Sequence, residues 1–243
     1  MERIELTWSS GALGREATLV RWGWYGKPVL LFPTSSGGPD EVESFGLVKA
    51  LAPLVDAGRV KVYSIGCPEA SVWMDRSADG GERSAAMASF DQHVLEEVAP
   101  RILEDCEAPA DLRITAAGAN VGAFSAVNAV AKHPERFDIA VGMSGMYDFD
   151  RWMGSHFDSD YYFNQPLRFL PNLEGATLSQ VQKGLFVLAT GTGRWEEPDQ
   201  TRRLASVLQA KRIPNSTEVW GPDADHDWPT WRTMLPLFLG RVL

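Results

Sequence analysis

The chain has 243 residues, of which 44% are hydrophobic and 23% charged, a composition typical of an ordinary soluble globular protein. This composition excludes collagen-like, low-complexity and disordered proteins. A chain of this length buries about 70–75% of the surface that its unfolded form exposes, so its stability requires neither disulfides nor a structural metal. No repeat or linker divides the sequence, and we expect a single domain over residues 1–243.

The balance of charged residues indicates which classes of partner the protein can bind. There are 32 Asp and Glu residues against 23 Lys and Arg, which gives a net charge of −9 and repels nucleic acid. Charges at Glu2, Arg3 and Glu5 occupy the place where a signal peptide needs an apolar run, and no stretch of about 18 apolar residues follows. We therefore expect a cytoplasmic protein with no nucleic-acid and no membrane partner.

Cys67 and Cys106 lack CxxC spacing, and we interpret them as reduced thiols.

The first part of the chain predicts two strands and two helices. The apolar run 28–32 is typical of a buried strand, and a turn-rich segment, 33–38, follows it. Helical spacing over 45–57 ends at a glycine, and a second strand is expected over 60–65. Residues 82–104 then have the amphipathic pattern of a long helix.

The middle of the chain contains a strand, a glycine-bounded turn and a helix in immediate succession. The strand is expected over 112–116, the turn over 118–122 and the helix, rich in small residues, over 123–132. A fourth strand is expected over 137–143. Residues 148–178 are rich in aromatic and turn-forming residues without a clear period, so we expect an irregular excursion over the sheet.

The last part continues the alternation. Strands are expected over 184–190 and 217–220, and helices over 199–211 and 231–242. Alternation of strands and helices along a chain predicts an α/β fold with a mainly parallel sheet and helices on both faces. Ligands of such sheets bind beyond the carboxyl ends of the strands, so the loops after the strands are the candidate functional segments.

The first such loop is centred on Asn120. Gly118 and Gly122 allow a tight strand-to-helix turn that pushes the middle side chain out of the sheet, as in a nucleophile elbow. That motif has serine in the middle, where this chain has Asn120. A dinucleotide-binding GxGxxG loop is the rival interpretation, but it needs a glycine where this chain has Ala116.

The second loop contains His226, between the last predicted strand and the last helix. Of the four histidines, it alone matches the chain order and strand position of the base in a hydrolase triad. We interpret His93, His133 and His156 as surface or packing residues. The third loop follows the penultimate strand and offers Glu196 and Glu197 as the acid that orients the histidine. Either carboxylate also fits the first turn of the following helix; we prefer Glu196, and Asp199 fits the helix start better.

With these motifs in this order, the chain resembles the α/β-hydrolase superfamily, and in particular small bacterial esterases of the esterase D and antigen 85 type. The resemblance covers nearly the whole chain. It is carried by six segments: residues 28–38, 118–122, 144–148, 162–166, 193–197 and 225–229. It implies that His226 is the general base, that Glu196 or Glu197 is the orienting acid, and that backbone groups near Ser35, Ser36 and Val121 form an oxyanion hole. It also implies serine at the position of Asn120.

The asparagine conflicts with the implied activity. A serine esterase needs a hydroxyl whose proton the histidine takes, and the amide nitrogen of Asn120 is no such nucleophile because its lone pair is delocalised. Alanine is the commoner choice for an introduced inactivating substitution, which favours a natural asparagine. The sequence thus favours a catalytically impaired pseudo-esterase that binds a ligand or partner. The alternative is an active carboxylic-ester hydrolase or lyase in which His226 works by a non-serine mechanism.

The expected partner is a small-molecule ester or acyl ligand. The sequence leaves open whether the protein forms a homo-oligomer. No cofactor and no metal site is expected. We expect His226 to lie within hydrogen-bonding reach of Asn120, with Glu196 or Glu197 on the other ring nitrogen.

Overall fold

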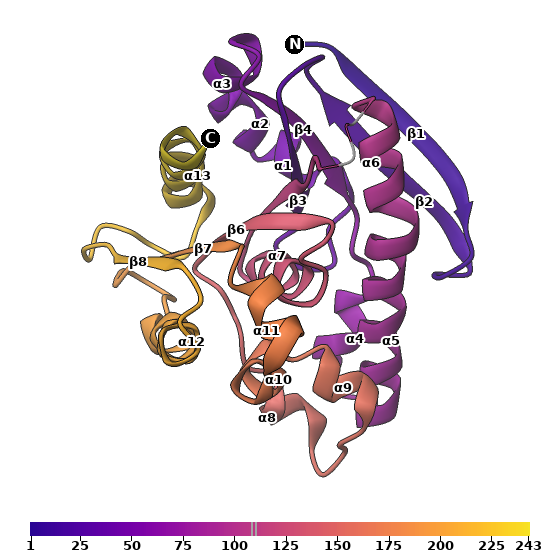
Figure 1. Cartoon of the computed structure of the whole chain (residues 1–243), viewed down its shortest axis with the longest axis vertical. Coiled ribbons are helices and arrows are strands. Elements are labelled where there is room, and N and C mark those ends of the chain that lie inside the picture. The colour runs from indigo at the N-terminus through magenta and orange to yellow at the C-terminus, as the bar shows by residue number, and fades with distance from the viewer. Residues whose placement is uncertain (108, 110) are drawn as a thin grey trace.

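The computed structural model describes residues 1–107, 109 and 111–243 of the chain. Eight strands form one sheet in the order β1-β2-β4-β3-β5-β6-β7-β8 (Figure 1). The strands are β1 (Arg3–Ser10), β2 (Arg15–Trp22), β3 (Lys27–Phe32), β4 (Val60–Ile65), β5 (Ile114–Ala119), β6 (Phe137–Met143), β7 (Leu185–Thr190) and β8 (Asn215–Val219). From β4 to β8 all neighbouring strands are parallel, whereas β1 and β2 are antiparallel to their neighbours. The prediction of a mainly parallel sheet is therefore confirmed.

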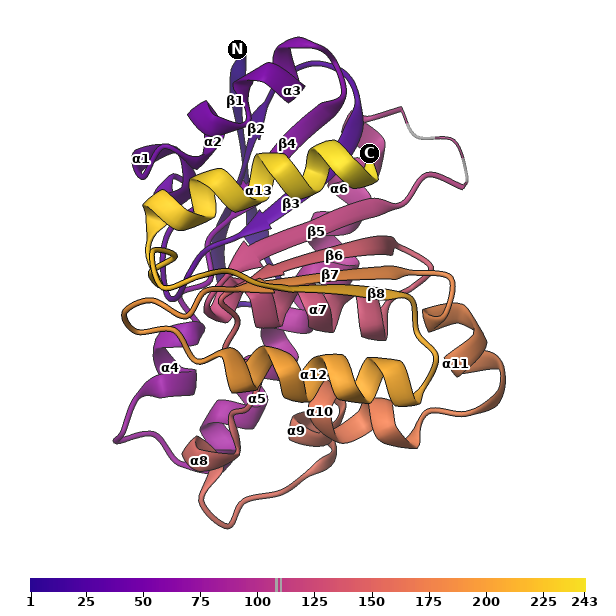
Figure 2. The same cartoon turned by 90° about the vertical axis from the view of Figure 1, so that its left-hand side faces the viewer.

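Helices cover both faces of this sheet (Figure 2). The helices are α1 (Glu41–Ser44), α2 (Leu47–Ala50), α3 (Ala52–Asp56), α4 (Ala70–Met74), α5 (Gly80–His93), the π-helix η1 (Val94–Val98), α6 (Ala99–Asp105), α7 (Val121–Lys132), α8 (Asp150–Met153), α9 (Ser159–Phe163), α10 (Pro166–Phe169), the 3-10 helix η2 (Leu170–Asn172), α11 (Gly175–Val181), α12 (Pro198–Ala210) and α13 (Trp228–Val242). One hydrophobic cluster packs α1, α2, α3 and α13 against one face, and a second packs α5, α7 and α12 against the other. None of the described helices is long and apolar enough to cross a membrane.

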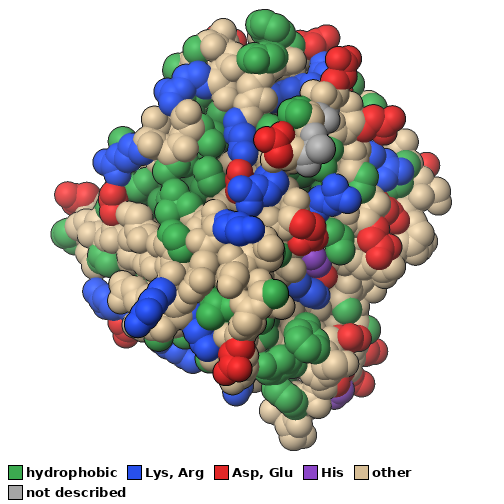
Figure 3. Space-filling view, in the orientation of Figure 1, with side chains coloured by type: hydrophobic (Ala, Val, Ile, Leu, Met, Phe, Trp, Pro, Cys, Tyr) green, Lys and Arg blue, Asp and Glu red, His purple; other side chains and the backbone are tan. Residues whose placement is uncertain are grey.

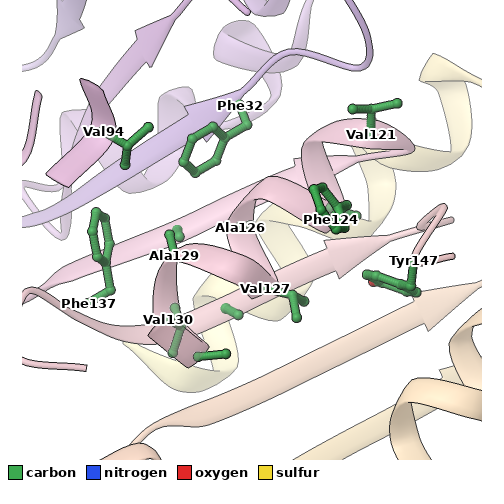
Figure 4. Close-up of a cluster of buried hydrophobic side chains, with 14 of the residues drawn as sticks. Phe32, Val94, Val121, Phe124, Ala126, Val127, Ala129, Val130, Phe137 and Tyr147 are labelled. Atoms are coloured by element: carbon green, nitrogen blue, oxygen red, sulfur yellow. The ribbon is translucent and has the colours of Figure 1, made fainter. Parts of the chain in front are cut away.

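The central strand β5 shows why the sheet has two hydrophobic faces. Side chains alternate along a strand, so Ala116 belongs to one hydrophobic cluster while Ala117 and Ala119 belong to the other. The helix after β5, α7, is buried along almost its whole length. Figure 4 shows its Phe124 and Val127 within the cluster that also contains Tyr147. A helix buried on all sides is held firmly, which fixes the turn that precedes it.

The hairpin β1–β2 was not predicted from the sequence. Strand β1 lies at the edge of the sheet and is mostly exposed, so it has no apolar run to identify it.

The surface seen in the orientation of Figure 1 mixes basic and acidic side chains, so the net negative charge forms no single patch there (Figure 3).

Two helical segments also differ from expectation. The predicted helix 45–57 is two short helices, α2 and α3, because the chain turns at Gly46, whose φ is 77°, and a new helix starts just before Pro53. The excursion 148–178 is not irregular throughout but contains short helices. The Asp158 side chain caps one of them by accepting from the Tyr161 N–H, and Pro166 begins another.

Candidate active site

The turn at Asn120 joins β5 directly to α7. Asn120 has a φ of 55° and a ψ of −118°, an uncommon conformation for a residue other than glycine. Its N–H donates to the carbonyl of Met143 at 3.0 Å, which ties the turn to the end of β6. This strand, strained residue and helix have the geometry that exposes the nucleophile in α/β-hydrolases.

Both of these positions in the turn must be glycine, because backbone atoms of neighbouring segments lie where a Cβ would be. A Cβ on Gly118 would lie 2.4 Å from the carbonyl carbon of Gly122. A Cβ on Gly122 would lie 2.5 Å from the carbonyl oxygen of Pro33. Side-chain carbons do not approach backbone atoms this closely, so the turn and the end of β3 pack together only without side chains here.

His226 lies in the loop between β8 and α13, and its Nδ1 is 3.8 Å from Glu196 Oε2. The imidazole packs edge-on against Trp231 at a centroid distance of 5.2 Å. Its backbone N–H donates to the Arg194 carbonyl at 3.0 Å, which joins the histidine loop to the acidic loop after β7. Among the described residues, the Asn120 side chain makes no hydrogen bond with this ring.

The Glu196 carboxylate is fully buried and held by hydroxyl donors. Ser144 Oγ donates to Oε1 at 2.5 Å, and Thr190 Oγ1 donates to Oε2 at 2.8 Å. Trp231 Nε1 donates in turn to Ser144 Oγ at 2.9 Å. Burial alone raises the pKa of Glu196, but the neighbouring His226 and the hydrogen bonds from Ser144 and Thr190 outweigh it and lower the pKa below its ordinary value. The site therefore keeps an ionised carboxylate beside the histidine.

The other acidic candidates lie elsewhere. Glu197 is exposed at the start of α12, where its carboxylate accepts from the Gln200 amide at 3.4 Å. Asp199 lies in the first turn of that helix and pairs with Arg202 on the surface. Of the three carboxylates, Glu196 alone faces the ring of His226.

The backbone donors implied for an oxyanion hole are only partly free. The Val121 N–H already donates to the Thr34 carbonyl at 3.2 Å. The Thr34 N–H and hydroxyl in turn donate to the Glu41 carboxylate, at 2.7 and 2.9 Å. The N–H groups of Ser35 and Ser36 make no hydrogen bond within the described part of the chain. An oxyanion would thus have to displace the Thr34 carbonyl to reach Val121.

Three residues that were not predicted as site residues, Ser144, Thr190 and Trp231, complete the carboxylate network. A signal was available for two of them, since Thr190 is the last residue of β7 and Ser144 directly follows β6. Polar residues at the carboxyl ends of parallel strands meet at one edge of the sheet. Ser144 also has a φ of 47°, a strained conformation that no sequence pattern reveals.

The remaining histidines pair with carboxylates outside this site: His133 with Asp91, His156 with Asp158 and His93 with Glu97. The described residues include no group of three His, Cys, Asp or Glu side chains placed to hold a metal ion.

Comparisons with solved structures place this arrangement in a known fold. A ferulic acid esterase superposes with a TM-score of 0.75 at 15% identity, covering 99% of this chain and 97% of that one. An S-formylglutathione hydrolase from Agrobacterium tumefaciens gives a TM-score of 0.74 at 14% identity, covering 98% and 93%. The chain has the α/β-hydrolase fold.

MPT51 of Mycobacterium tuberculosis also matches this α/β-hydrolase fold, with a TM-score of 0.69 at 16% identity, covering 100% of this chain and 98% of that one. Structural neighbours therefore include esterases of the type that the sequence resembles. No family model and no curated protein matches the chain. At these identities the neighbours show the fold, and the chemistry has to be argued from the residues.

Proposed function

We propose that this protein is an esterase-like pseudoenzyme, which keeps the hydrolase scaffold but lacks acyl-enzyme chemistry and binds a small ester or acyl ligand. The observation that carries the proposal is Asn120 at the elbow. An amide has no hydroxyl proton for an imidazole to remove, and its nitrogen is not nucleophilic. In a serine protease, deletion of the nucleophile costs about 10⁶ in turnover.

Neither Ser125 nor Ser144 replaces the missing hydroxyl. Ser125 lies inside α7, where its hydroxyl donates to the Val121 carbonyl at 3.3 Å. Ser144 lies beside Glu196 and is buried under Trp231. Both hydroxyls are bound to the protein, which supports the loss of serine chemistry at this site.

The loop after β3 supports the same proposal. Because the Val121 N–H donates to Thr34, one expected oxyanion donor is occupied. The loss of one such donor typically costs about 10²–10³ in turnover. The nearby Glu41 carboxylate adds a negative charge close to where an oxyanion would develop.

Aromatic side chains at the rim support binding of an apolar acyl group. Phe45 and Trp228 stack in parallel at a centroid distance of 4.6 Å, beside the loop of His226. Trp195 follows Arg194 and is 84% exposed. Aromatic side chains supply large apolar contact area for a ligand.

A second candidate function is favoured by the intact His226–Glu196 pair. A carboxylate beside an imidazole is the arrangement that orients a histidine base and stabilises its charged form. In this alternative, His226 activates water directly and the protein is an active carboxylic-ester hydrolase or lyase.

Labelling with an alkyl fluorophosphonate tests the proposal, because an activated serine oxygen attacks phosphorus and displaces fluoride. By intact mass, the protein should form no adduct, and Asn120→Ser should form one that depends on His226. A His226-dependent adduct on the unmodified chain would contradict the proposal. The Asn120→Ala variant is the matched control, because it also lacks a hydroxyl and should stay unlabelled.

A further inference from the structure

Another histidine–carboxylate pair joins His93, the last residue of α5, to Glu97 in η1. His93 is only 1% exposed, and its Nδ1 lies 3.0 Å from Glu97 Oε2. The chain between them is the π-helix η1, a rare form that often occurs at functional sites. Figure 1 shows the turn of the β1–β2 hairpin beside α5, and Ser10 Oγ lies 3.2 Å from the same Nδ1.

The surroundings of Glu97 fix the tautomer of His93. Trp8 Nε1 and the Ala12 N–H donate to the carboxylate at 2.8 and 3.0 Å. Burial raises the pKa of Glu97, but these donors outweigh it and lower the pKa to about 2, so the group is an anion. A carboxylate only accepts, so His93 Nδ1 carries the hydrogen. Burial lowers the pKa of His93, which keeps the ring neutral and leaves a lone pair on Nε2.

That Nε2 atom has no hydrogen-bond partner among the described residues. The ring itself is held in place, since it stacks on Trp8 at a centroid distance of 5.6 Å. His93 lines a cavity of about 210 Å³. A water molecule occupies about 30 Å³ in the liquid, so the cavity holds several waters or one small ligand.

The rest of the cavity offers hydrogen-bond donors and a further acceptor. Ser36 contributes a hydroxyl, and the N–H groups of Gly37 and Gly38 make no hydrogen bond in the described part of the chain. Arg15 also lines the cavity, but Glu69 neutralises it through contacts of 2.7 and 3.1 Å. The Glu16 carboxylate lines the cavity too and has no ion-pair partner among the described residues, so the wall repels an anion and offers a second acceptor beside His93 Nε2.

We propose that this cavity binds a small uncharged polyhydroxy compound, a polyol or monosaccharide, one hydroxyl of which donates to His93 Nε2. Its other oxygens accept from the Ser36 hydroxyl and from the N–H groups of Gly37 and Gly38, and a second hydroxyl donates to Glu16. A hydroxyl both donates and accepts, which matches a wall that holds donors and acceptors together. The cavity shares the loop after β3 with the candidate active site, but none of its lining residues belongs to the turn 118–122, and the proposal does not depend on whether that turn is catalytic.

The test follows the histidine ring nitrogens by ¹⁵N NMR while glycerol, glucose or myo-inositol is added. At least one of these compounds should shift the His93 Nε2 signal in a saturable way, without shifting His156, which lies outside the cavity. Sodium acetate and methylammonium chloride are the charged comparators. The proposal is wrong if none of the three polyols gives a saturable shift at His93, or if a charged comparator binds more tightly.

A variant pair then tests the contact itself. His93→Asn places an amide N–H near the position of Nδ1, so the donor to Glu97 stays while the acceptor at Nε2 is lost. Binding should weaken by about tenfold, the effect of one lost hydrogen bond. His156→Asn is the matched control and should bind like the unmodified protein. Unchanged affinity in His93→Asn would overturn the assignment, and should that variant not fold, the titration of the unmodified protein decides alone.

Discussion

Removing the hydroxyl of Ser144 should destabilise the protein strongly. Its Oγ donates to buried Glu196 at 2.5 Å and accepts from Trp231 Nε1 at 2.9 Å. Ser144→Ala leaves the indole N–H without a partner, which costs about 1–3 kcal/mol. It also removes a hydrogen bond to a charged group, worth about 1.5–3 kcal/mol. The free energy of unfolding should fall by about 2.5–6 kcal/mol, and Tm by at least about 5 °C.

Urea and thermal unfolding measure this effect, with Ser206→Ala as the control. Ser206 is exposed on α12, where its hydroxyl donates to the Arg202 carbonyl, so its loss should change stability by less than about 0.5 kcal/mol. The pH dependence gives a second readout. Because folding lowers the pKa of Glu196 from its ordinary value of 4.5, the ionised carboxylate stabilises the folded protein at pH values above 4.5. This stabilisation is lost as the pH falls through the folded-state pKa. Ser144→Ala should reduce this acid-dependent part, and a loss below about 1 kcal/mol at neutral pH would refute the reasoning.

Two further predictions concern the elbow turn and the second histidine pair. Gly122→Ala should destabilise the protein by about 1–3 kcal/mol or more, because the new Cβ would lie 2.5 Å from the Pro33 carbonyl oxygen. Denaturant unfolding measures this loss. Gly240→Ala is the control, because a Cβ there meets nothing within 4 Å. Glu97→Gln should lower stability at neutral pH, and the difference from the unmodified protein should disappear as the pH falls from 4.5 to about 2, because the low pKa of Glu97 stabilises only the ionised form. A difference that persists in acid would show that the carboxylate charge is not responsible.

The sequence could predict most of the parallel part of the sheet because its inner strands are buried on both faces. Apolar runs such as 28–32 and 139–143 are characteristic of strands between two helix layers. The edge strand β1 has no such run, since most of its side chains face solvent. The short helices between β6 and β7 were missed because tertiary packing and single caps, such as Asp158, decide them.

The candidate site was predictable only in its outline. The glycine pair around Asn120 and the order of Glu196 and His226 along the chain are local patterns that a sequence displays. The links from Trp231 to Ser144 and on to Glu196 join α13 to the segments that follow β6 and β7, and no local pattern encodes such contacts. The same holds for the bond from the Val121 N–H to the Thr34 carbonyl, which depends on how two loops pack.

The most direct measurement of the central claim is the turnover of p-nitrophenyl acetate by the unmodified protein, by Asn120→Ser and by each combined with His226→Ala. The unmodified protein should show only background hydrolysis that His226→Ala leaves unchanged. Asn120→Ser should raise turnover by at least about 10², less than the 10⁶ that a nucleophile is worth, because Thr34 occupies the Val121 donor. Substantial turnover by the unmodified protein that disappears in His226→Ala would contradict the loss of chemistry and favour direct activation of water.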